Sequence, residues 1–215
     1  MHFSADTLQR LKTEAEEGAD NWVSTNEALL AHVYTLLLDA AGVDDRERCG
    51  VHVSVDLRGK VGELIPQRML GRAVVNTNAA GGDKLVFDLS EPTKAGERVH
   101  NAMREELEPS KLLCRHEAGN YFWARYASLI NPTSPESTHD LDWNFQGKSP
   151  YYAIDVGAGK PVRGVPWNLG EGIKVAPFAQ GGLDVFISDM TEMHGWAEHD
   201  IIGDVMAANL LANSM

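Results

Sequence analysis

The sequence predicts an α/β protein in which helices pack against a mixed β-sheet. Three observations support this prediction: helical patterns fill the first forty residues, a strict apolar–polar alternation follows at 51–57, and several short strand-like runs lie between 138 and 188. A Gly181-Gly182 turn joins the last two of these runs as a hairpin. Such a mixture is typical of a two-layer sandwich, and 215 residues suffice for one domain, 1–215, or a closely packed half of a two-domain protein.

Two helices are predicted near the N-terminus. Ser4 can cap a helix that runs to about Glu17 and carries an apolar stripe. The spacing of Ser24 and Glu27 is that of a capping box, in which each side chain satisfies a backbone N–H of the other residue. The helix that it opens, to about Ala41, is apolar almost all round and is therefore expected to be buried against a sheet.

Three strands are predicted in the next part of the chain. The alternation at 51–57 gives one aliphatic face and one polar face, and two short runs follow at 73–77 and 85–89 around a glycine-rich turn at 81–83. The polar face of the first strand would carry His52, Ser54 and Asp56.

The remaining elements are a helical region, four strand-like runs and a closing helix. Pro92 suits the first turn of a helical region that extends to about residue 130 with a break near 108–110, and 131–135 reads as a loop. The predicted strands are 138–145, 151–155, 173–178 and 183–188, followed by a helix at 191–211.

Composition excludes several function classes. The net charge is −12 and the basic residues are scattered, which argues against a nucleic-acid partner. No apolar run reaches about 18 residues, so no membrane span is expected, and no secretory signal pattern opens the chain. The only cysteines, Cys49 and Cys114, are isolated, which predicts a reducing, cytoplasmic location without a disulfide or a zinc site.

The stretch 149–161, SPYYAIDVGAGKP, predicts a tight turn. A short β-prone run leads into Asp155, after which Gly157 and Gly159 permit backbone angles closed to other residues. The turn would hold Asp155 in a defined place.

This stretch resembles the DFGWG-K-P signature of the BAHD acyltransferases and their fungal relatives, with Val156 and Ala158 as departures. Further segments resemble the family's motifs in the family's order, all from its C-terminal half. They are FSADTLQRLK at 3–12, WVSTNEAL at 22–29, VDLRG at 55–59, LGRAV at 70–74 and Asp142-Trp143, which stands for a Ser/Thr-Trp pair.

The resemblance implies one half of a chloramphenicol-acetyltransferase-like (CoA-dependent acyltransferase) fold. It further implies acyl transfer from an acyl-CoA co-substrate to a hydroxyl or amine of a small-molecule acceptor, usually in secondary metabolism, with no bound cofactor and no metal. The family's general base, a His of an H-x-x-x-D motif, belongs to the N-terminal half. Two literal matches here, His2 to Asp6 and His52 to Asp56, are expected to be coincidental. In the first, Ser4 and Asp6 are better explained as a helix cap and a first-turn acid. In the second, i and i+4 lie about 13 Å apart on a strand.

The resemblance also implies roles for particular residues. Asp155 is expected to form a partly buried ion pair with Arg58 that pins the Gly157–Gly159 turn to the sheet. Asp142 and Trp143 are expected to line the substrate channel, although an ionised Asp142 accepts hydrogen bonds only and cannot hold an oxyanion. Trp143 as a core aromatic residue is the alternative.

The resemblance and the charge pattern leave partners open. Lys148, Lys160 and Arg163 flank the glycine turn and form either a basic patch for coenzyme A or a solvated edge. The chain is expected to need an N-terminal half, fused or separate, or to self-associate, and to be inactive alone. The alternative function is a non-catalytic half-protein that binds a partner half or acyl-CoA.

Overall fold

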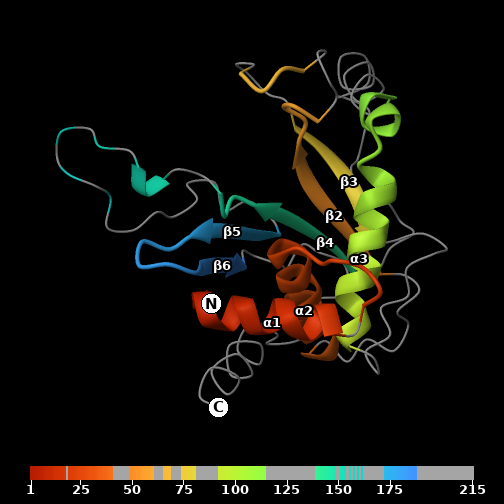
Figure 1. The fold of residues 1–215 in the computed structure, drawn as a ribbon, viewed down its shortest axis with the longest axis horizontal. Coiled ribbons are helices and arrows are strands. Elements are labelled where there is room, and N and C mark those ends of the chain that lie inside the picture. The colour runs from red at the N-terminus through yellow and green to blue at the C-terminus, as the bar shows by residue number, and fades with distance from the viewer. Residues whose placement is uncertain are drawn as a thin grey trace.

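The computed structural model describes residues 1–17, 19–40, 49–60, 65–68, 74–80, 92–114, 139–148, 151–153, 155, 157, 159, 161 and 172–187. In these residues, helices cover one face of a six-stranded mixed sheet with the order β1-β6-β5-β4-β2-β3 (Figure 1). The predicted α/β class is confirmed. The helices are α1 (Ala5–Glu17), α2 (Thr25–Ala40) and α3 (Pro92–Glu106), and the strands are β1 (His2–Phe3), β2 (Cys49–Asp56), β3 (Val74–Ala80), β4 (His139–Phe145), β5 (Ile173–Pro177) and β6 (Leu183–Ile187).

The centre of the sheet is parallel. Strand β4 pairs in parallel with β2 on one side and with β5 on the other, whereas β3, β6 and β1 add antiparallel strands outside them. The carboxyl ends of β2, β4 and β5 therefore meet at one edge of the sheet, called the carboxyl edge below (Figure 1).

The core lies between the sheet and the helix layer. Val51, Val53 and Val55 of β2 are buried there, as the alternation predicted, together with the leucines of α2. His52 and Ser54 are half-buried and Asp56 is exposed, so the polar residues of β2 point away from this core. The apolar circumference of α2 follows from its central position, because the helix contacts the sheet, α1 and α3.

Both predicted helix caps are formed. The Ser4 hydroxyl accepts a hydrogen bond from the Thr7 N–H at 3.1 Å. In the capping box of α2, the Ser24 N–H donates to Glu27 Oε2 at 2.7 Å and the Glu27 N–H donates to Ser24 Oγ at 3.2 Å. These bonds satisfy N–H groups that a helix start leaves without an intrahelical partner.

A short edge strand, β1, was not predicted. Its residues pair with the start of β6, His2 opposite Asp184 and Phe3 opposite Leu183. Two residues are too few to show an alternation in the sequence. The strand depends on Gly182, which adopts φ +91° and whose hydrogen lies where a Cβ would collide with the Phe3 carbonyl oxygen.

One predicted strand is wrong, and others lie outside the described residues. Tyr151–Ala153 form a turn of 3₁₀-helix in place of the strand expected at 151–155. Both edges of β4 are already occupied, by β2 and β5, so the aromatic run has no neighbouring strand to pair with there. The strand at 85–89 and the helices expected at 115–130 and 191–211 lie outside the described residues. Among those described, no helix is long and apolar enough to span a bilayer.

Candidate functional site

Strand β4 carries the first candidate residues. Trp143 is fully buried in the core, and its register partners are Val53 of β2 and Ile173 of β5, both buried too. The indole Nε1–H donates a 2.9 Å hydrogen bond to Oδ1 of Asn26, in the first turn of α2. This placement matches the alternative of a core aromatic residue, so the indole is not part of an exposed channel wall.

The residues that flank Trp143 occupy register positions on the opposite, polar side of the sheet. Asp142 stands directly opposite His52 of β2, and Asn144 stands opposite Lys174 of β5. Neighbouring strands lie only about 4.8 Å apart, so the pairing places a histidine and an aspartate at adjacent positions of the sheet. We call the set His52, Ser54, Asp142, Asn144 and Lys174 the polar sheet face.

Neither literal H-x-x-x-D match forms a local histidine–aspartate pair. His2 Nδ1 lies 2.9 Å from Oδ1 of Asp184, on the neighbouring strand, and its side chain faces that residue instead of Asp6. The neighbour of His52 across the sheet is Asp142 instead of Asp56. Sequence spacing could not show either pairing, because both join strands that are far apart in the chain.

The expected ion pair between Asp155 and Arg58 is not formed, and this expectation is wrong. Asp155 is exposed, and its Oδ1 accepts hydrogen bonds from the N–H groups of Gly157 at 2.8 Å and Gly159 at 3.2 Å. Arg58 instead donates from its guanidinium to Oδ2 of Asp56 at 2.9 Å. Asp56 is the nearer partner in the chain, and the resulting contact needs no long-range closure.

The glycine turn nevertheless has the predicted backbone. Gly157 and Gly159 both adopt φ +92°, a region that other residues rarely enter. Nothing lies within 4 Å of the position of a Cβ at either residue, so it is the backbone angle and not crowding that requires glycine here. The turn is held locally by the Asp155 carboxylate.

Of the three basic residues predicted beside the turn, the structure describes one. Lys148 is exposed in the turn that follows β4. Lys160 and Arg163 lie outside the described residues. A fourth basic residue, Lys60, was not predicted and lies in the turn after β2, at the same carboxyl edge as Lys148.

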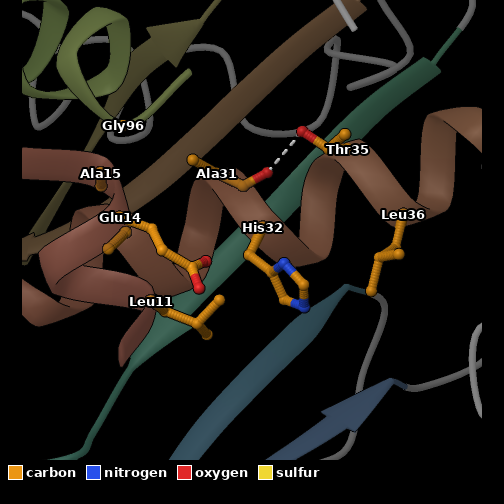
Figure 2. A pocket seen from close by; sticks show the side chains of 9 residues that line it. Leu11, Glu14, Ala15, Ala31, His32, Thr35, Leu36 and Gly96 are labelled. Atoms are coloured by element: carbon orange, nitrogen blue, oxygen red, sulfur yellow. Dashed lines mark hydrogen bonds between the residues drawn. The ribbon is translucent and has the colours of Figure 1, made fainter. Parts of the chain in front are cut away.

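A pocket of about 260 Å³ opens in the helix layer (Figure 2). His32 of α2 and Glu14 of α1 contribute its titratable groups, and the hydroxyl of Thr35 is engaged by the Ala31 carbonyl at 2.8 Å. Desolvation by burial, followed by the charge of Arg10, lowers the pKa of His32, so its imidazole is neutral at pH 7. The lining consists of Leu11, Glu14, Ala15, Ala28, Ala31, His32, Thr35, Leu36 and Gly96.

This pocket is better suited to binding a small apolar group than to catalysis. Four of its lining residues are alanine or glycine, and the Glu14 carboxylate is exposed, with Nε of Arg10 at 3.9 Å. The pocket lies between the helices (Figure 2). The strand register places the polar sheet face on the side of the sheet away from the helix layer. No group of three metal-ligating side chains occurs within the described residues.

Comparison with known proteins gives one sequence relative and a set of structural neighbours, and no family model matches the chain. The chain is 24% identical over 207 residues to agmatine coumaroyltransferase-1 from Hordeum vulgare, a match that covers 87% of this chain and 44% of that protein. TRI101 of F. sporotrichioides, solved with coenzyme A and T-2, superposes with a TM-score of 0.69 at 20% identity, covering 98% of this chain and 48% of that one. Vinorine synthase gives a TM-score of 0.60 at 16% identity, covering 86% and 42%.

These comparisons confirm the predicted fold, one sheet-and-helix unit of the CoA-dependent acyltransferase type. The chain spans somewhat less than half the length of each of these relatives.

Proposed function

Because the chain is BAHD-like in sequence and fold, we propose that it forms the C-terminal half of an acyl-CoA-dependent acyltransferase. The observation that carries this proposal is the continuity of the likeness. It runs over nearly the whole chain, and the motifs from FSADTLQRLK to the glycine turn keep the order of that half of the family.

In the proposed reaction an acceptor hydroxyl or amine attacks the thioester carbonyl of acyl-CoA. A C–O or C–N bond forms, the C–S bond breaks, and the proton lost by the acceptor ends on the coenzyme A thiolate. A histidine is suited to carry that proton because its pKa lies near the working pH. The other half of the enzyme, fused or separate, would supply this base, so the 215-residue chain alone would be inactive.

The contribution of this chain would be one wall of the substrate channel, formed by the polar sheet face. By the resemblance, Asp142 would occupy the position where a family hydroxyl faces the reacting carbonyl. Trp143 would support it from behind through the core, with its indole fixed to Asn26 at 2.9 Å. Lys148, Lys160 and Arg163 would contribute positive charge toward the phosphates of coenzyme A, and the Gly157–Gly159 turn would be structural.

A second candidate is a non-catalytic half-protein that binds acyl-CoA, a partner half or a second copy of itself. One feature of the sequence favours it: an ionised Asp142 in the channel would repel a developing oxyanion instead of stabilising it. In either case we propose a cytoplasmic protein, because the cysteines are isolated and Cys114 is a free, exposed thiol.

Two measurements test the proposal. The first is the intact mass of the native polypeptide, which we expect to be about twice the 23.5 kDa of this chain if both halves are fused. The second is thiol release by that native polypeptide, or by this chain with its partner half, from p-coumaroyl-CoA and acetyl-CoA with agmatine and a panel of alcohols and amines. Reactions without an acceptor serve as the control.

The outcomes separate the two candidates. Acceptor-dependent thiol release supports the transferase. Saturable binding of acyl-CoA without thiol release in the presence of any acceptor favours the non-catalytic protein. The absence of both acyl-CoA binding and thiol release contradicts the proposal.

A further inference from the structure

The carboxyl edge of the sheet presents two lysines from neighbouring turns. Lys60 follows β2 and Lys148 follows β4, and these two strands are adjacent and parallel, so their turns leave the sheet on the same side. Both side chains are exposed. In parallel sheets the crevice outside the carboxyl ends of the strands is where ligands characteristically bind.

Both turns are held firmly by backbone contacts. In the first, the Gly59 N–H donates to the Ile65 carbonyl and the Lys60 N–H donates to the Leu57 carbonyl, each at 2.9 Å. Leu57 and Ile65 are buried in a small apolar cluster beneath this turn. The backbone that presents Lys60 is therefore fixed before any ligand arrives, which lowers the entropic cost of binding.

The second turn is equally constrained. The Gln146 N–H donates to the Val175 carbonyl at 2.7 Å, which fixes the chain immediately before Gly147. A Cβ at Gly147 would lie 2.8 Å from Leu183 and would also overlap the ring of Phe145, so this turn packs closely on the sheet. The Lys148 backbone is thereby held at the end of β4.

Among the described residues, the carboxylate of Asp56 acts against the repulsion that Lys148 exerts on Lys60. Within the described part of the chain neither Lys60 nor Lys148 forms an ion pair, and the adjacent carboxylate of Asp56 is engaged by Arg58 at 2.9 Å. Partial desolvation lowers the pKa of Lys60, Asp56 acts in the opposite direction, and the Lys148 ammonium lowers it again. Two ammonium groups thus repel each other in a protein whose net charge is −12.

We propose that Lys60 and Lys148 form a binding site for a phosphate-bearing anion at the carboxyl edge of β2 and β4. An anion between the two ammonium groups gains two attractions at once, while Arg58 engages the neighbouring carboxylate of Asp56. Phosphate is the anion class that fits best, because its several oxygens can accept hydrogen bonds from both groups at once. The phosphate could belong to a nucleotide-containing thioester, which rests on the proposed function, or to a free polyphosphate, which does not.

The test is titration of the native polypeptide with inorganic pyrophosphate and, separately, with coenzyme A, followed by isothermal calorimetry and amide NMR. We expect pyrophosphate to shift the amide signals of 58–60 and 147–148. Lys60→Gln and Lys148→Gln should each weaken pyrophosphate binding about three- to tenfold, because each removes one of the two cationic contacts. Lys94→Gln, in the first turn of α3, removes the same charge elsewhere and should leave binding unchanged.

The two ligands identify the source of the phosphate. If both substitutions also weaken coenzyme A binding, the site serves the thioester; if coenzyme A is unaffected, the site takes free polyphosphate. Pyrophosphate that fails to bind, or a loss of equal size in Lys94→Gln, overturns the proposal, since the attraction would then be absent or nonspecific. Pyrophosphate binding that persists in a protein without thiol release contradicts only the acyltransferase function.

Discussion

The hydrogen bond between Asn26 and Trp143 offers the most direct test of how the helix layer is fixed to the central strand. Its Nε1–Oδ1 distance is 2.9 Å, and it joins the first turn of α2 to the middle of β4. The Trp143 side chain is fully buried, so its N–H has no route to bulk water once the acceptor is removed. We therefore expect Asn26→Ala to destabilise the protein although Asn26 itself is only half-buried.

The expected magnitude follows from the burial of the donor. Leaving a buried N–H unsatisfied costs about 1–3 kcal/mol of unfolding free energy. Alanine is the better helix former by roughly 0.5 kcal/mol, which offsets part of this cost. The net loss for Asn26→Ala should therefore be about 0.5–2.5 kcal/mol.

The assay is urea denaturation followed by far-UV circular dichroism, with a double-mutant cycle through Trp143→Phe. Phenylalanine removes the donor, so Asn26→Ala should cost about 1 kcal/mol less in that background than in the wild type. Asn26→Asp is the matched control, because a carboxylate of the same shape keeps an acceptor and is favourable in a first helical turn. It should change the stability by less than about 0.5 kcal/mol.

Two results would refute this reasoning. Equal costs of Asn26→Ala with tryptophan and with phenylalanine at 143 would show that the two side chains are not coupled. A loss of similar size in Asn26→Asp would show that the shape of the site matters and the hydrogen bond does not.

Three further predictions concern stability. Gly182→Ala should lower the unfolding free energy clearly more than Gly181→Ala, because only a Cβ at Gly182 meets the Phe3 carbonyl. At Gly181 the positive φ alone costs about 1–2 kcal/mol. Equal melting temperatures of the two variants would contradict this prediction. Because the pKa of His32 is lowered from 6.5 in the folded protein, the unfolded state binds more protons, so the unfolding free energy should fall as the pH drops below about 6.5. His32→Gln should flatten this fall in urea titrations at pH 7.5 and 5.5, and an unchanged slope would exclude His32 as its source. Asp155→Ala should change the unfolding free energy by less than about 1 kcal/mol, since the carboxylate is exposed and holds only its own turn; a larger loss would restore a long-range role.

The sequence by itself determined the local features of this protein. Each of these features can be predicted from residues close together in the chain, because the interactions that select it span only a few positions. They are the caps of α1 and α2, the alternation of β2, the hairpin between β5 and β6, and the glycines of the turn after Asp155. The order of the motifs along the chain was also enough to predict the fold, because this prediction does not depend on knowing any single contact.

Only the tertiary structure decided which distant residues meet. The sheet order places Asp142 beside His52 and brings the turn of Lys148 to the same edge as that of Lys60. It also leaves no free edge on β4 for Tyr151–Ala153 and turns Trp143 toward Asn26. Pairing between strands depends on the free energy of the whole sheet and its helix layer, and no local pattern in a strand records which neighbour it will have.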